Sequence, residues 1–127
     1  MSRVLVIDDN MDVRRQFATT LRCAGHDVAE AENGRDGLAL LRSSATDVVI
    51  VDILMPEVDG LEVIVTLKSI HSPVAIVAVS GGGMLDGFMY LRLAHLLGAH
   101  STLEKPVSPA ELLAVVDELA HSAPHAA

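Results

Sequence analysis

Four strand-like runs of this chain each end on a polar or charged residue. The runs are VLVID at 4–8, VVIVD at 48–52, VAIVAVS at 74–80 and STLEK at 101–105, and a weaker run covers 27–31. The first three are almost entirely Val, Ile, Leu and Ala, which is typical of strands that are buried on both faces. Such strands are parallel and have helices packed on either side. The pattern therefore predicts an α/β fold.

Helical patterns separate the runs. The first repeats Val13, Phe17, Leu21 and Ala24 before Gly25, the second covers 35–43, the third follows Gly60 with Leu61, Ile64 and Val65, the fourth covers 86–97 before Gly98, and the fifth begins at Pro109 after Ser108. Glycine after an apolar helical stripe is a stop signal, and Ser followed by Pro is a start signal. Five strand–helix units predict a doubly wound, five-stranded parallel sheet in the order 2-1-3-4-5, the flavodoxin-like (βα)5 fold.

The chain of 127 residues has the length of one domain, which we expect to cover 1–121. The small, unpatterned residues 122–127 predict a disordered tail. The net charge of −8 argues against a nucleic-acid surface, which needs clustered Lys and Arg. The single Cys23 excludes an intrachain disulfide and is expected to pack as a small core residue.

The amino-terminal residues lack the basic start and the long apolar stretch of a signal peptide. No run reaches the ~18 apolar residues that a membrane-spanning helix needs. We therefore expect a soluble, cytoplasmic protein that does not bind a membrane.

The polar ends of the runs should meet, because parallel strands place their carboxyl ends at one edge of the sheet. Asp8 and Asp9 end the first run, Asp52 ends the VVIVD run, and Ser80 and Lys105 end the last two. In the predicted order the first and third strands are neighbours, and ligands bind in the crevice beyond their carboxyl ends. We therefore expect three carboxylates, a hydroxyl and an ammonium around one site.

Clustered carboxylates need a counter-charge, since two of them about 4 Å apart repel by about 4 kcal/mol at an effective dielectric constant of about 20. Oxygen ligands favour Mg²⁺, whereas the lone Cys and the scattered His residues lack the spacing of a zinc site. A magnesium ion beside a carboxylate, a hydroxyl and an ammonium suits phosphoryl transfer. Asp52 would be the nucleophile, Lys105 would pair with phosphoryl oxygens, and Ser80 would donate a hydrogen bond to one of them.

Four motifs in this order resemble the receiver domain of two-component response regulators: VLVIDD, VVIVDILMPEVDG, VAVSG and LEKPV. The resemblance covers residues 3–120. It implies that Asp9, Asp52 and the carbonyl of Leu54 bind Mg²⁺ directly, and that Asp8 acts mainly through a bound water.

The same resemblance implies a partner, either a histidine kinase or a histidine phosphotransfer protein, that supplies the phosphoryl group from a phosphohistidine. The receiver itself would catalyse this transfer and its own slow dephosphorylation, without being a turnover enzyme. Its output would go to an unknown protein target. The peptide bond between Lys105 and Pro106 would be cis.

Three further features of the sequence bear on how this chain would signal. Receivers couple the hydroxyl to an aromatic residue three positions before the lysine, and this chain has Thr102 there, so the usual aromatic switch is not expected. The glycines after Ser80, followed by YLRLAHLLGA, resemble a subset of stand-alone receivers that have no output domain. The predicted fourth helix is apolar around much of its surface, which favours a partner or homodimer surface on the fourth and fifth helices. Its apolar residues are Met89, Leu91, Leu93, Leu96 and Leu97.

Several functions stay open at this point. A lone receiver can bind a target when phosphorylated, relay the group onward, or act as a phosphate sink for a shared kinase. An aspartate-nucleophile phosphatase typically has a second acid two residues after its nucleophile, where this chain has Leu54. A flavin carrier on the same sheet would have a phosphate-holding loop after the first strand, where this chain has Asp8 and Asp9.

Overall fold

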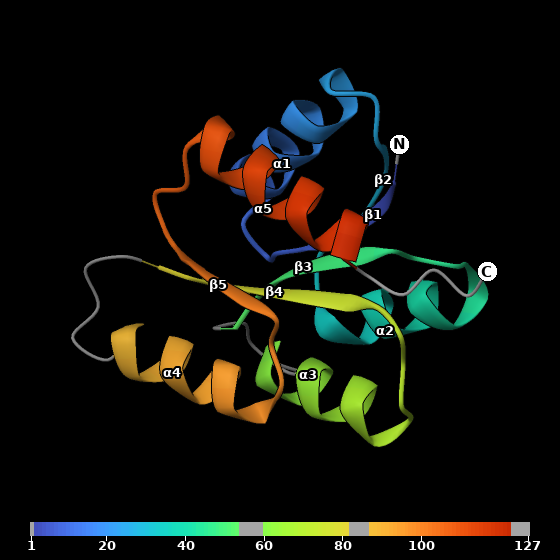
Figure 1. Ribbon diagram of the computed structural model, residues 1–127, viewed down its shortest axis with the longest axis vertical. Coiled ribbons are helices and arrows are strands. Elements are labelled where there is room, and N and C mark those ends of the chain that lie inside the picture. Colours follow the sequence, from blue (N-terminus) through green and yellow to red (C-terminus); the bar gives the residue numbers. More distant parts are fainter. Residues whose placement is uncertain (1, 54–59, 82–86, 123–127) are drawn as a thin grey trace.

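The computed structural model confirms the predicted doubly wound sheet (Figure 1). The structure describes residues 2–53, 60–81 and 87–122. All strands of the sheet are parallel, and their order is β2-β1-β3-β4-β5. In chain order the elements are β1 (Arg3–Ile7), α1 (Met11–Cys23), β2 (Asp27–Ala31), α2 (Gly34–Ser43), β3 (Val48–Asp52), α3 (Gly60–Ser69), β4 (Ala75–Ser80), α4 (Gly87–Leu97), β5 (Ser101–Glu104) and α5 (Pro109–Ser122).

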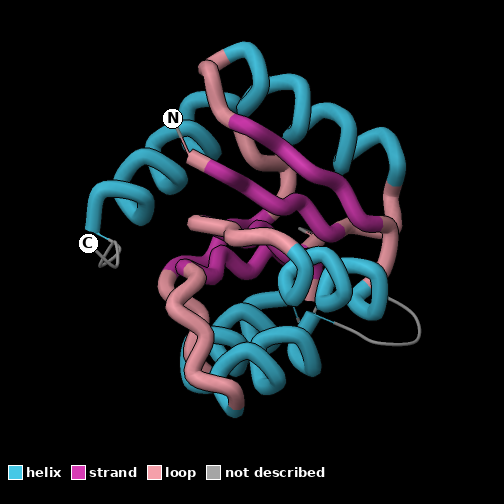
Figure 2. Tube along the Cα trace, turned by 90° about the vertical axis from the view of Figure 1, so that its right-hand side faces the viewer, coloured by secondary structure: helices cyan, strands magenta, loops and turns pink. Residues whose placement is uncertain are grey.

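Helices cover both faces of the sheet, with α1 and α5 on one face and α2, α3 and α4 on the other (Figure 1). Figure 2, turned by 90°, shows the twisted strands between these two helical layers. Alternate strand residues face the two layers: Leu5 and Ile7 belong to the core cluster on the side of α2, α3 and α4, whereas Val4 and Val6 belong to the cluster on the side of α1 and α5. Every residue of β3 and β4 is buried, which explains why their sequences are continuously apolar.

Polar side chains cap the amino-terminal ends of two helices, and the sequence predicted the second of these caps. The side chain of Asn10 accepts hydrogen bonds from the main-chain N–H groups of Asp12 and Val13, at 3.0 and 3.1 Å, and so caps α1. Ser108 Oγ accepts from the N–H of Glu111 at 3.1 Å and caps α5, which begins at Pro109 as predicted. These caps satisfy donors that the helices themselves leave unpaired.

Two expectations about α1 were wrong. Cys23 is exposed and does not belong to the core. Ala24 is also exposed, because it is the C-cap that ends the helix and not part of its buried stripe. The face of α1 that contacts the sheet holds Phe17, Ala18 and Leu21, and a residue two positions beyond Leu21 points away from that face.

Helix α5 ends at Ser122, one residue beyond the domain boundary expected from the sequence, and the rest of the predicted tail lies outside the described residues. Among the described ranges, every helix is too short or too polar to cross a bilayer. The cytoplasmic location stays a prediction.

Candidate functional site

Three carboxylates meet where β1 and β3 end. One ligand oxygen each from Asp8, Asp9 and Asp52 can be chosen so that all lie within 4.8 Å of one another. Asp8 and Asp52 are only 2% and 6% exposed, whereas Asp9 is exposed to solvent. The cluster forms because β1 and β3 are hydrogen-bonded neighbours, so their carboxyl ends share one edge of the sheet. The predicted convergence of these acids is confirmed.

Lys105 brings a positive charge to this site. Its Nζ lies 3.0 Å from Asp8 Oδ2 and 3.2 Å from Asp52 Oδ2. Burial alone would lower the pKa of Lys105, but the hydrogen bonds and negative charges of Asp8 and Asp52 outweigh it, so this pKa lies above its ordinary value. The ammonium is therefore protonated and shared between two buried carboxylates.

The backbone around Lys105 brings β5 to the site. The N–H of Lys105 donates to the carbonyl oxygen of Ser80 at 2.7 Å, which extends the pairing of β4 with β5 beyond Glu104. The peptide bond between Lys105 and Pro106 is cis, as the family resemblance implied.

Ser80 ends β4 with its side chain completely buried. Within the part of the chain that the structure describes, its Oγ has no hydrogen-bond partner. The residue before it, Val79, pairs with Asp52 in the β3–β4 register, so Ser80 lies one position beyond the end of β3. A buried hydroxyl without a partner costs free energy, and a ligand oxygen at this edge would satisfy it.

The ends of β1 and β3 are held by main-chain contacts. The N–H of Asp8 donates to the carbonyl oxygen of Ala31 at 3.1 Å, and Asp8 Oδ1 accepts from the N–H of Asn10 at 2.9 Å. The N–H of Ile53 donates to the carbonyl oxygen of Val79 at 3.0 Å. These bonds orient the two buried carboxylates before any ligand arrives.

Gly60 was noted in the sequence only as the residue before a helix, yet it decides how closely α3 approaches β3. A Cβ at Gly60 would overlap the carbonyl oxygen of Asp52 and the Cα of Ile53. Only glycine allows this approach of two backbones. The DG pair at the end of the VVIVDILMPEVDG motif was the signal for it.

Leu54 and Thr102 were also singled out in the sequence. Leu54, whose carbonyl was expected to bind Mg²⁺, lies outside the described residues. Thr102 lies in β5, partly buried, where it pairs with Ala78. No ring therefore occupies this position of β5.

A cavity of about 410 Å³ opens beside the site, between α1 and the segment that follows β5. Its walls are mainly apolar near Phe17, Pro106 and Val107, and Lys105 forms part of its floor. Lys105 therefore borders both the acidic cluster and this cavity.

A family model described as the response regulator receiver domain matches residues 4–117. The chain therefore belongs to the response regulator receiver domain family. Among its relatives, it is 36% identical over 118 residues to the transcriptional regulatory protein PrrA of Mycobacterium tuberculosis, which covers 92% of this chain and 49% of PrrA. It is 32% identical over 116 residues to protein PilG of Pseudomonas aeruginosa, which covers 90% of this chain and 84% of PilG.

Solved structures agree with this assignment. The receiver domain of NtrX from Brucella abortus has 28% sequence identity and a TM-score of 0.87, with 94% of this chain and 98% of that chain covered. A receiver domain protein from Clostridium thermocellum has 28% identity and a TM-score of 0.86, with 95% of each chain covered. The chain spans about half the length of curated relatives such as PrrA, so what those whole proteins do does not transfer directly.

Proposed function

We propose that this chain is a phosphoacceptor response regulator of a two-component phosphorelay, and that it accepts the phosphoryl group on Asp52. The observation that supports this most directly is the place of Asp52: it lies at the end of β3, within the acidic cluster, with Lys105 Nζ 3.2 Å from its Oδ2. Membership of the receiver family supports the same function.

The residues present fit a magnesium ion. All three candidate side chains are carboxylates, and hard oxygen ligands are what Mg²⁺ prefers. In this proposal Asp9 and Asp52 bind the ion directly with the carbonyl of Leu54, while Asp8 acts mainly through a water molecule. When bound, Mg²⁺ would neutralise negative charge on the acidic cluster and on the incoming phosphoryl group.

In this transfer, a phosphohistidine on the partner protein would be the phosphoryl donor. A carboxylate oxygen of Asp52 attacks phosphorus, and the bond between phosphorus and the imidazole nitrogen breaks. The bond electrons stay with the imidazole nitrogen, which then takes a proton from solvent. Lys105 would pair with one phosphoryl oxygen and Ser80 Oγ would donate a hydrogen bond to another, so both stabilise the charge that spreads over these oxygens.

This chemistry makes the chain a switch and not a turnover enzyme, with only self-catalysed transfer and slow loss of its own phosphoryl group. An aspartate-nucleophile phosphatase is the weaker alternative, because Leu54 stands where such enzymes have a second acid. A relay intermediate or a phosphate sink without direct output would use the same site.

The donor would be a histidine kinase or a histidine phosphotransfer protein. Asp52 is only 6% exposed, so the partner would have to bring its phosphohistidine close to the end of β3. The cavity beside Lys105, with Phe17 and Val107 in its walls, offers an apolar surface near the site on which a partner helix or loop could pack.

The phosphorylated chain would signal to a protein partner through a different surface, on α4. On α4, Leu91 is buried, while Met89, Leu93 and Leu96 are 68%, 42% and 74% exposed. Exposed residues three and four apart share one face of a helix. This face supports the proposal of a partner surface or a homodimer through α4 and α5.

The test is intact-mass analysis after incubation with Mg²⁺ and a small phosphodonor such as acetyl phosphate. We expect the wild type to gain one phosphoryl group, and Asp52→Asn to gain none. Asp27→Asn removes an exposed carboxylate at the opposite edge of the sheet and should behave as the wild type. Unchanged phosphorylation of Asp52→Asn would overturn the proposal.

A further inference from the structure

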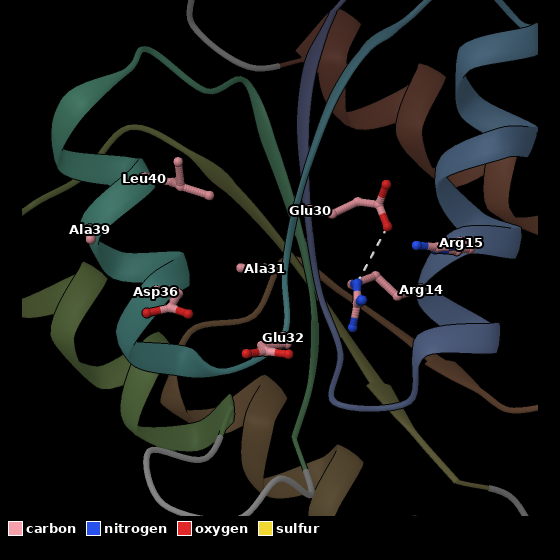
Figure 3. Close-up of a pocket in the computed structure, with 8 residues that line it drawn as sticks. All are labelled: Arg14, Arg15, Glu30, Ala31, Glu32, Asp36, Ala39 and Leu40. Carbon is pink, nitrogen blue, oxygen red and sulfur yellow. Dashed lines mark hydrogen bonds and ion pairs between the residues drawn. The ribbon is translucent and has the colours of Figure 1, made fainter.

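Arg14, in the first turn of α1, links this helix to two other segments next to the acidic cluster, the end of β1 and strand β2. Its Nη1 donates to the main-chain carbonyl oxygen of Asp8 at 2.9 Å. Its Nε pairs with Glu30 Oε1 on β2 at 3.3 Å, across one side of a cavity of about 590 Å³ (Figure 3). The Arg14 and Glu30 side chains are 13% and 24% exposed, so this pair is shielded from most of the solvent.

A second arginine holds Glu30 in place. Arg22, two turns further along α1, has its Nη1 3.1 Å from Glu30 Oε2. Its Nη2 donates to the carbonyl oxygen of Val28 at 2.9 Å. Both carboxylate oxygens of Glu30 are therefore used, and the carboxylate is a fixed anchor for Arg14.

The carbonyl that Arg14 binds belongs to the peptide group between Asp8 and Asp9. Side chains of consecutive strand residues point to opposite faces, so both acids reach one site only if the backbone turns between them. A peptide group is planar, so a hydrogen bond to the Asp8 carbonyl restrains the orientation of the whole group, including the N–H of Asp9. The N–H of Asp8 is held from the other side by the carbonyl of Ala31 at 3.1 Å.

We infer that Arg14 is a positioning residue of the cation site, which acts by fixing the peptide group that directs Asp9 toward Asp52. It is not a ligand, since its contacts are to a main-chain carbonyl and to Glu30. This inference rests on the proposed function, because it requires the acidic cluster to bind Mg²⁺.

Charge and position predict opposite effects when Arg14 is changed. A positive charge near a cation site repels the cation, so loss of that charge alone should tighten Mg²⁺ binding. Loss of a residue that orients the ligands should weaken it, and residues that support metal ligands typically change metal affinity by about 10-fold or more. The sign of the change therefore separates the two roles.

The experiment measures the Mg²⁺ dissociation constant of the unphosphorylated chain by calorimetry or by NMR titration, with the thermal midpoint of each variant. We expect Arg14→Met to raise this constant about 10-fold. Arg14→Lys should also raise the dissociation constant. A lysine keeps the positive charge, but it lacks the planar guanidinium that binds the Asp8 carbonyl and Glu30 together. The matched control is Arg15→Met, which removes a charge from an exposed neighbour. It should leave the constant unchanged or slightly lower.

Equal Mg²⁺ affinity for Arg14→Met and Arg15→Met would overturn the inference, even if Arg14→Met also lowered the thermal midpoint. Should Arg14→Met fail to fold, the Mg²⁺ affinity of Arg14→Lys is compared with that of Arg15→Met instead, and equal affinities would again overturn the inference. Absence of Mg²⁺ binding by the wild type is a different result: it overturns the proposed cation site, and the inference falls with it.

Discussion

Lys105 Nζ lies 3.2 Å from Asp52 Oδ2, although 53 positions of sequence separate the two residues. The same ammonium lies 3.0 Å from Asp8 Oδ2, so one cation contacts two buried carboxylates at the carboxyl ends of neighbouring strands. Lys105 thus places a positive charge in direct contact with both of these acids. One ammonium among three carboxylates leaves the site with an excess of negative charge before any divalent ion arrives.

Replacement of Lys105 by Met should destabilise the protein most strongly when Mg²⁺ is absent. The change leaves two buried carboxylates without their positive partner, and we expect the free energy of unfolding to fall by about 2 kcal/mol. Saturating Mg²⁺ should shrink the difference from the wild type, since the ion then supplies the missing charge. Urea unfolding with EDTA and with Mg²⁺ measures both values. Equal stability of the two proteins in EDTA would contradict this account of the site.

Ser80→Ala should slow phosphorylation without destabilising the protein. Because Ser80 Oγ is buried and has no partner among the described residues, its removal should leave the thermal midpoint unchanged or raise it. The rate of phosphorylation by acetyl phosphate should fall about 10-fold, which is the effect of losing about 1.4 kcal/mol of transition-state stabilisation. Ser69→Ala, which removes an exposed hydroxyl on α3, is the control for both measurements. A clear drop in the midpoint of Ser80→Ala alone would show that the hydroxyl has a structural partner.

Gly60→Ala should be costly because the new methyl group would overlap the main chain of Asp52 and Ile53. Main chain cannot move aside as a flexible side chain can, so we expect a loss of about 2 kcal/mol or more in the free energy of unfolding. Gly81→Ala is the matched control, because an added Cβ there meets no atom within 4 Å. Chemical denaturation of the two variants tests the contrast, and similar stabilities would refute it.

The stability of the protein should decline in mild acid partly because of His100. Its Nδ1 accepts a hydrogen bond from the N–H of Ile76 at 2.9 Å, which requires that nitrogen to be unprotonated. Burial first, and then the positive charge of Lys68, lower the pKa of His100 from its ordinary value of 6.5. Since the folded-state pKa is lower than that of the unfolded chain, this stabilisation is complete above 6.5 and is lost as pH falls from there through the folded-state pKa.

His100→Asn should keep an acceptor near Ile76 but remove the titration. Thermal unfolding between about pH 7.5 and pH 5 should then show a smaller loss of stability for this variant than for the wild type. His71→Asn is the control, because His71 is exposed and its positive φ of 54° is one that asparagine tolerates. Identical pH profiles for His100→Asn and the wild type would exclude this role of His100.

Much of the fold could be predicted because its signals are local or repeat regularly. The Ser108 cap lies three residues from its partner Glu111, and the apolar runs report burial on both faces without any knowledge of their neighbours. The exposure of Cys23 was missed because a helical pattern near its end does not say which residues still face the sheet. Arg14 was missed because its partners, Asp8 just after β1 and Glu30 on β2, lie outside the helix whose pattern was analysed.

The sequence by itself determined the order of the elements, the parallel sheet and the identity of the polar strand ends, because periodicity and capping depend on residues close together along the chain. Only the tertiary structure decided that Lys105 contacts both Asp8 and Asp52, that Gly60 lies against β3, and that Ser80 is buried without a partner among the described residues. These contacts depend on side-chain positions and on how closely the helices pack against the strands, and no local pattern contains that information.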